Sequence, residues 1–144
     1  MHEEEIADCL DLMLESIKLI ESRFLKVESP DEFVQSSEGI TLLDAIAMRL
    51  QVIGELVKKI QKMVPSFLEP YSDVEWDKIA RFRDLVSHHY DQVDHEIVYD
   101  ICKVHIPRLK LILLKIHADL SASDNNQPWK PISENNLLKK IQRS

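Results

Sequence analysis

Apolar residues recur every three or four positions along most of the chain, which is the repeat of a helix that buries one side. The repeat predicts long helices over residues 3–26, 41–63 and 74–90, and a fourth from 95 to about 120. Four helices with short connections predict an all-α fold, an antiparallel up-and-down bundle. The stripes expected to face the core are Ile6, Leu10, Met13, Ile17, Ile20, Phe24 and Val27; Leu43, Ile46, Leu50, Ile53, Val57 and Ile60; Ile79, Phe82, Val86 and His89 or Tyr90; and Ile97, Ile101, Val104, Leu109, Leu113, Ile116 and Leu120.

A few residues interrupt these stripes or mark their ends. The first helix stops before Pro30, and a short helical turn follows with Phe33 facing inward. Gly54 lies inside the second helix, where glycine costs about 1 kcal/mol relative to alanine, so we expect a close approach of another helix there. Asp94 suits the N-cap of the fourth helix. Pro107 falls where the fourth stripe slips by one residue, which predicts a kink because the repeat resumes at once.

The 144 residues predict one main domain and an extension. Residues 1–120 would form the helical bundle, and residues 121–144 a polar linker with a short C-terminal helix or tail. The chain has only two glycines, which argues against a barrel or sandwich with many tight turns. Leu111, Ile112 and Leu114 widen the apolar arc of the fourth helix beyond one stripe, and such a surplus face suits a dimer interface.

Charge and composition limit the classes of function. The formal net charge of -7 argues against a broad nucleic-acid-binding surface. Residues 101–144 are nevertheless basic, with 8 bases and 3 acids, and could touch phosphates or simply form a solvated face. Cys9 and Cys102 lie far apart and are expected to be reduced, buried thiols. Because the sequence shows neither a membrane-spanning run nor a signal peptide, we expect a cytoplasmic protein that does not enter membranes.

One segment concentrates chemically active side chains. Arg83, His88 and Tyr90 follow the spacing R-x4-H-x-Y near the end of the third predicted helix. Arginine can neutralise a phosphate, histidine can move a proton near pH 7, and a phenol can accept a transferred group. The three residues together suggest phosphodiester chemistry without a metal. Adjacent His88 and His89 diverge by about 100° on a helix and lack a spaced third ligand, so a metal site is not expected.

Three motifs in order resemble the HepT group of HEPN-domain proteins, the toxin half of the HepT–MNT toxin–antitoxin pairs. The resemblance covers roughly residues 3–120, and the extension after residue 120 has no counterpart in it. The matching stretches are Ile53-Gly54-Glu55-Leu56, Trp76-Asp77-Lys78-Ile79 followed by the R-x4-H-x-Y motif, and Val93-Asp94 with the later Ile106-Pro107-Arg108-Leu109.

The resemblance implies a metal-independent endoribonuclease, without cofactor, that cleaves RNA such as tRNA or mRNA as a homodimer. Arg83 and His88 from both protomers would meet as catalytic residues in a cleft at the dimer interface. The family's MNT antitoxin, a minimal nucleotidyltransferase, would AMPylate Tyr90. Asp84 and Ser87 are the expected supporting residues, although Asp84 stands where asparagine is common and its carboxylate would repel the scissile phosphate unless a cation balances it.

Helix geometry favours a shared site independently of the resemblance. Residues five apart differ by about 140° around a regular helix, so Arg83 and His88 would point different ways, whereas Arg83 and Tyr90 share a face. Two copies of the helix that cross at a dimer axis could still bring both groups to one phosphate, as could a helix that ends near His88. The simpler alternative is a surface arginine, a packed histidine and a tyrosine at the edge of the core.

Two other functions remain open at this stage. The chain could be a non-catalytic helical subunit that binds nucleotides or substrate for a minimal nucleotidyltransferase, with Arg83 and His88 holding phosphates. It could also be an interaction bundle whose motif only supports dimerisation. The acidic net charge favours these two, and the intact Arg83–His88 pair favours the nuclease.

Overall fold

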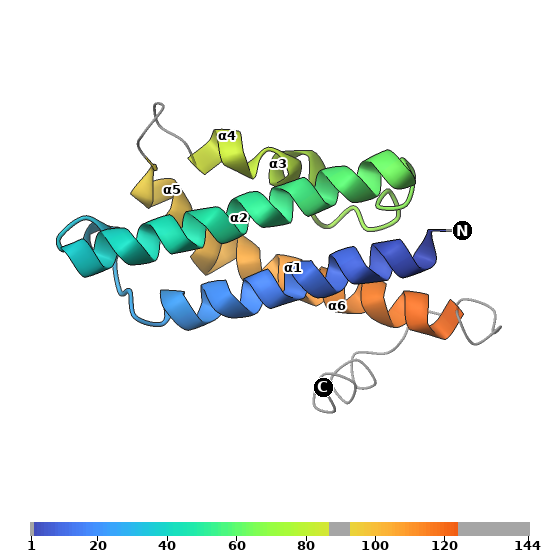
Figure 1. The fold of residues 1–144 in the computed structure, drawn as a ribbon, viewed down its shortest axis with the longest axis horizontal. Coiled ribbons are helices and arrows are strands. Elements are labelled where there is room, and N and C mark those ends of the chain that lie inside the picture. Colours follow the sequence, from blue (N-terminus) through green and yellow to red (C-terminus); the bar gives the residue numbers. More distant parts are fainter. Residues whose placement is uncertain (1, 87–92, 124–144) are drawn as a thin grey trace.

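The computed structural model describes residues 2–86 and 93–123 of the chain. Both ranges are built from helices, without a strand, which confirms the predicted all-α bundle (Figure 1). The elements in order are α1 (Glu3–Phe24), the 3-10 helix η1 (Pro30–Phe33), α2 (Ser37–Met63), α3 (Trp76–Ala80), α4 (Phe82–Val86), α5 (His95–Asp100), the π-helix η2 (Ile101–His105) and α6 (Ile106–Ser123).

The long helices α1, α2 and α6 form the body of the bundle and enclose one core (Figure 1). The first two predicted stripes are buried, apart from Phe24 at the end of α1, which is partly buried. Two contacts tie α6 to α1: Lys110 Nζ lies 3.1 Å from Glu21 Oε2, and His117 Nε2 lies 2.9 Å from Asp11 Oδ1. Since the later residue of α6 meets the earlier residue of α1, the two helices are antiparallel.

The second helix begins at Ser37, four residues before the predicted start. The Ser36 side chain caps it by accepting a hydrogen bond from the Gly39 N–H at 3.0 Å. Gly39 is buried beneath η1, where a Cβ atom would collide with the Glu32 carbonyl oxygen. Phe33 of η1 is fully buried, as predicted.

Gly54 does mark a close approach, as expected from its place inside α2. A Cβ atom at this position would lie 2.8 Å from the Ile79 carbonyl oxygen and 3.3 Å from that of Ala80. The C-terminal end of α3 therefore rests directly on the backbone of α2. Any larger side chain at Gly54 would push the two helices apart.

The third predicted helix is divided, because α3 ends at Ala80 and α4 starts at Phe82. Arg81 lies between them with φ −104° and ψ 23°, outside regular helix, and its carbonyl accepts the Leu85 N–H of α4 at 3.0 Å. Ile79, Phe82 and Val86 keep helical spacing across the break and are all buried. The apolar repeat alone therefore did not indicate the break between α3 and α4.

The irregularity near Pro107 is a π-helix rather than a simple kink. In η2 the Ile106 N–H donates to the Ile101 carbonyl, five residues back, so one extra residue is accommodated. The core register differs from the predicted one before and within η2, whereas the predicted Leu109, Leu113 and Ile116 after it are buried. Val98 and Cys102 are buried, whereas the predicted core residues Ile97 and Val104 are 38% and 39% exposed.

A buried polar contact connects the loop after α2 to α6. The Tyr71 hydroxyl donates to Asp119 Oδ2 at 2.8 Å, and Asp119 is only 2% exposed. Burial, followed by the bond to Asp119, raises the pKa of the Tyr71 hydroxyl, so it stays a donor. The Tyr71 carbonyl accepts the Trp76 indole N–H at 2.8 Å and so positions the start of α3.

Within the described ranges no helix is long and apolar enough to cross a membrane.

Replacement of Gly54 by alanine should destabilise the protein although alanine favours helix. The added Cβ forces α2 away from the α3 carbonyls, and overpacking of this kind costs about 1–3 kcal/mol. Urea unfolding followed by circular dichroism measures the change. Gln51→Ala, one turn away on α2, is the control and should change stability little. A Gly54→Ala protein as stable as the wild type would show that the approach is not tight.

Candidate functional site

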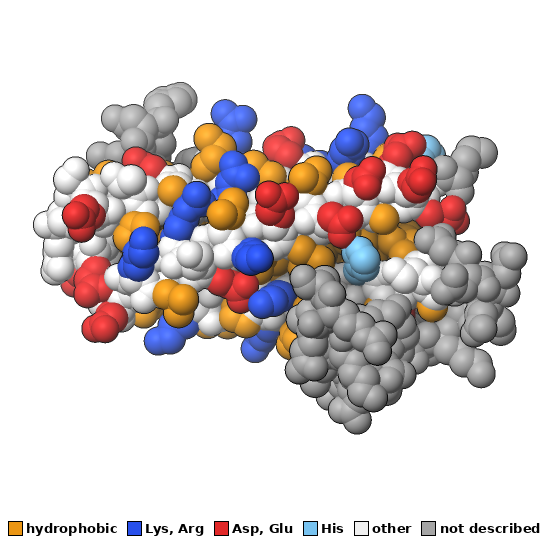
Figure 2. Space-filling view, turned by 60° about the horizontal axis from the view of Figure 1, so that its bottom comes forward, with side chains coloured by type: hydrophobic (Ala, Val, Ile, Leu, Met, Phe, Trp, Pro, Cys, Tyr) orange, Lys and Arg blue, Asp and Glu red, His pale blue; other side chains and the backbone are white. Residues whose placement is uncertain are grey.

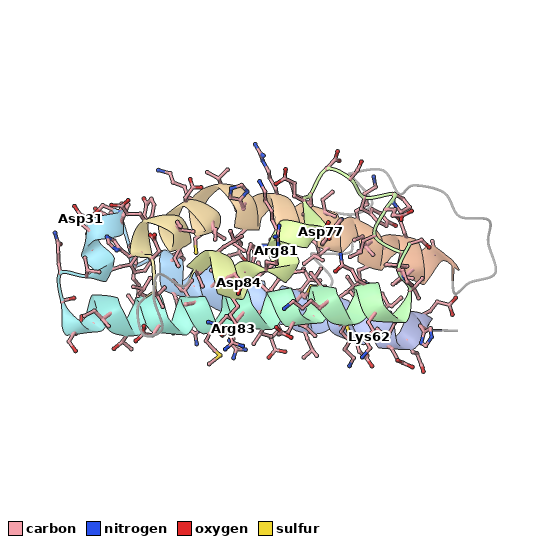
Figure 3. The ribbon with its side chains drawn as sticks, turned by 90° about the horizontal axis from the view of Figure 1, so that it is seen from above. Asp31, Lys62, Asp77, Arg81, Arg83 and Asp84 are labelled. Carbon is pink, nitrogen blue, oxygen red and sulfur yellow. The ribbon has the colours of Figure 1, made fainter. Side chains whose placement is uncertain are left out.

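The described part of the motif lies on α4. Arg83 and Asp84 are both exposed on this short helix. Figure 3 shows the Arg83 side chain coming from α4 and lying over α2, whereas Arg81 lies on the other side, toward α5 and α6. Ser87, His88, His89 and Tyr90 lie outside the described residues. The structure thus places the motif's guanidinium at the surface, beside the α2–α4 contact.

One hydrogen bond joins the two described ends of the motif segment. The Asp94 N–H donates to the carbonyl of Val86, the last residue of α4, at 2.7 Å. Asp94 also caps α5 as predicted, because its Oδ1 accepts the N–H groups of Glu96 and Ile97, both at 3.1 Å. Asp94 therefore fixes α4 and α5 relative to one another at the point where the chain enters and leaves residues 87–92.

A cluster of aromatic side chains supports α5 from the opposite side. Tyr99 packs edge-on against Phe24, with ring centroids 5.1 Å apart, and its hydroxyl donates to the Glu28 carbonyl at 2.9 Å. Phe33 approaches the same ring at 6.5 Å. These contacts of Tyr99 anchor α5 to α1 and η1, so α4 docks against a helix that is itself held in place.

The charged surface is mixed rather than uniformly basic. Figure 2 shows Lys and Arg side chains across the middle of one face, interspersed with hydrophobic ones, and Asp and Glu side chains toward both ends. This distribution agrees with the net charge of -7. A long nucleic-acid track of the kind that neutralises many phosphates is not evident on that face.

The cysteines do not form a reactive site. Cys9 and Cys102 are free and buried. Burial raises the pKa of the Cys102 thiol to about 12, so it stays protonated and unreactive near neutral pH. Among residues 2–86 and 93–123 no group of three or more His, Cys, Asp or Glu side chains could hold a metal ion. The chemical candidates are therefore the motif and the charged residues near α4.

Comparison with known proteins identifies the family. The model of the family described as "Ribonuclease HepT-like" matches residues 13–116, which include the whole motif. The chain belongs to the HepT-like ribonuclease family. This confirms the resemblance drawn from the three sequence motifs. No solved structure matches the chain.

Several relatives from Methanocaldococcus jannaschii carry related names. "Gamma-glutamylcyclotransferase and putative RNase MJ0434" is 34% identical over 91% of this chain, which spans only 55% of that longer protein. "Putative RNase MJ0127" is 32% identical over 67% of the chain and 74% of its own length. "Putative RNase MJ1216" is 33% identical over 72% of the chain and 80% of its own length.

The structure also adds residues near α4 that the sequence analysis left without a role. Lys78, His105 and Arg108 line a groove beside this helix, together with carboxylates from α5 and the loop before α3. Nothing in the sequence links His105 to residues 78–85, so a role for it could not be predicted. The stripe slip near Pro107 was the one local signal, since it marks the π-helix that contains His105.

Replacement of Asp94 by alanine should loosen the motif segment. Loss of an N-cap side chain costs about 1 kcal/mol, and here it frees the start of α5 beside Val86. Hydrogen-exchange mass spectrometry should show faster exchange in the peptide covering residues 86–98. Asp44→Ala, an exposed change in α2, should leave this peptide unchanged. Equal exchange in the wild type and the Asp94→Ala protein would contradict the role given to this cap.

Proposed function

We propose that this HepT-like protein is the toxin of a toxin–antitoxin pair and acts in the cytoplasm as a metal-independent endoribonuclease on tRNA or mRNA. The observation that carries the proposal is the place of Arg83. Arg83 is exposed on α4, three residues before Val86, whose carbonyl accepts the Asp94 N–H. Membership in the HepT-like ribonuclease family supports the same activity.

The motif residues supply the groups that metal-free RNA cleavage needs. The 2′-OH of the substrate attacks the adjacent phosphorus, the 2′-O–P bond forms, and the bond from phosphorus to the 5′-oxygen breaks. His88 from one or both copies takes the 2′-OH proton and returns a proton to the leaving 5′-oxygen, a contribution of about 10²–10⁴-fold. Arg83 binds two phosphate oxygens with its planar guanidinium and stabilises the charge that builds on them. Asp84 and Ser87 support these groups from neighbouring positions.

The active form in this proposal is a homodimer. A five-residue spacing turns Arg83 and His88 about 140° apart on a regular helix, so a second copy that crosses at a dimer axis would bring both groups to one phosphate. Within one copy the same would require the helix to end near His88. The outer face of η2 and α6 offers apolar surface for such contact, with Val104 39% and Leu111 60% exposed. Leu111 was among the residues that predicted a surplus apolar face.

Control would come from an MNT-type nucleotidyltransferase that transfers AMP to Tyr90. The transferred group would add a phosphate beside Arg83 and His88 and would compete with the RNA phosphate for both cations. A second candidate, a non-catalytic nucleotide-binding subunit of that transferase, is favoured by the acidic net charge of the chain. RNA cleavage in EDTA separates the nuclease from this binding subunit.

The nuclease proposal predicts cleavage in the presence of EDTA that depends on both cationic residues. Purified protein should cut defined tRNA, and His88→Ala should lower the rate about 10²–10⁴-fold. Arg83→Ala should lower it about 10²-fold or more, because a preorganised charge is lost. Arg81→Ala is the matched control, since Arg81 lies two residues away on the other side of α4 (Figure 3). Full activity of both variants would contradict the Arg83–His88 site, and no cleavage by the wild type would leave the two non-catalytic candidates.

The modification proposal predicts a defined mass change. Co-expression with an MNT-type transferase should add whole AMP increments to the intact protein, and Tyr90→Phe should remove them. Tyr99→Phe is the control, because the Tyr99 hydroxyl already donates to the Glu28 carbonyl. AMP retained in the Tyr90→Phe protein would assign the modification to another residue.

A further inference from the structure

A groove runs between the α3–α4 pair and the α5–η2–α6 helix. Its volume is about 460 Å³, which falls in the range of small-ligand sites. On the α5–η2–α6 side, the groove is lined by Ile97, Ile101, His105 and Arg108, which follow one another at steps of four, four and three residues. The lining consists of Asp73, Val74, Glu75, Lys78, Ile79, Phe82, Leu85, Ile97, Asp100, Ile101, His105 and Arg108.

The inner part of the groove is apolar and comes from both sides. Ile79 and Phe82 contribute from α3 and α4, and Ile101 contributes from η2; all three are buried. Leu85 and Ile97 stand at the opening, 39% and 38% exposed. Large apolar side chains exposed in a hollow are suited to contact a flat, partly apolar ligand.

The rim carries hydrogen-bonding groups of both kinds. On the α3 side Glu75 Oε2 lies 2.7 Å from Lys78 Nζ. On the other side Asp100 Oδ2 lies 3.6 Å from His105 Nε2, with Arg108 further along the helix. The hydrogen bond from Lys78 lowers the pKa of Glu75, and His105 lowers it further from across the groove. Residues of both walls line the same groove, so their groups can act on one ligand.

The balance of charge excludes a phosphate as the preferred occupant. Three carboxylates, Asp73, Glu75 and Asp100, line the groove against two permanent cations, Lys78 and Arg108. An anion would meet repulsion from the carboxylates, whereas a neutral ligand with donors and acceptors on its edge would satisfy both sets of groups. A nucleobase is such a ligand, being planar, neutral and polar only at its rim.

We propose that this groove binds one unpaired base of the RNA substrate and that it prefers guanine. The inference rests on the proposed nuclease function and adds a determinant of sequence preference to it. Guanine presents two adjacent donors, N1–H and N2–H, that a carboxylate such as Glu75 or Asp100 can accept. It also presents O6 and N7, the acceptors that Lys and Arg side chains bind. RNA is read in this way through splayed-out bases in single-stranded segments.

The groove is placed to act on a base beside the cleaved bond. Leu85 lines it, and Arg83 stands two residues earlier on the same short helix. The two residues point to different sides of α4, so the phosphate would stay with Arg83 while a neighbouring base turns into the groove. Glu75, Asp100, Lys78 and Arg108 are in this view specificity-determining residues, and they take no part in proton transfer.

Nucleoside binding tests the groove separately from cleavage. The full chain, labelled with ¹⁵N, is titrated with guanosine, adenosine, cytidine and uridine, none of which contains a phosphodiester. Guanosine should shift the amide signals of Ile79, Phe82 and Ile101 and should bind at least about fivefold more tightly than the other three. Glu75→Gln and Asp100→Asn should each weaken guanosine binding about fivefold or more. Glu38→Gln and Asp44→Asn, exposed changes on α2, are the controls and should not.

The proposal would be overturned by equal binding of all four nucleosides, by no shift at these amides, or by guanosine binding that survives both groove substitutions. Groove signals that change with protein concentration alone would assign the groove to a second copy of the chain and would also overturn it. Guanosine binding without RNA cleavage would refute the nuclease and leave the groove intact. Cleavage that depends on Arg83 and His88 as expected, without guanosine binding, would support the nuclease and refute the base-binding groove.

Discussion

The contact of Gly54 with the end of α3 sets the position of the motif. Because Gly54 has no side chain, the Ile79 and Ala80 carbonyls can lie on the backbone of α2. The chain then turns at Arg81 and starts α4, whose Phe82 and Val86 enter the same core. Arg83, between these two anchors, is left at the surface over α2. A glycine that looks unfavourable within a helix is thus the condition for placing the proposed phosphate-binding residue.

A second constraint acts at the other end of α4. The Val86–Asp94 hydrogen bond and the Asp94 cap bring α4 and α5 together, and Tyr99 ties α5 to α1 and η1. The groove beside α4 depends on the same arrangement, since its walls are these two helices. The motif and the groove are therefore built by one set of contacts. A change that moves α4 should alter both the proposed phosphate site at Arg83 and the proposed base site.

Much of the fold follows from apolar spacing and a few special residues. The stripes of α1 and α2, the burial of Phe33, the role of Gly54 and the Asp94 cap were all predictable, because each leaves a signal in the local sequence. The break at Arg81 was not, since Ile79, Phe82 and Val86 keep their spacing across it. The stripe slip at Pro107 was visible but was interpreted as a kink, so Ile97 and Val104 were placed in the core in error. The groove was missed because residues 73–85 and 97–108 meet only in the folded chain.

The account depends most on a catalytic site that two copies share. The direct measurement is RNA cleavage in EDTA by mixed dimers of Arg83→Ala and His88→Ala chains, each carrying a different tag and isolated by both tags. A shared cleft predicts that the mixed dimer regains activity that neither variant has alone, because it holds one intact Arg83 and one intact His88. Mixed dimers that stay inactive, while doubly tagged wild-type dimers cleave, would contradict a shared site.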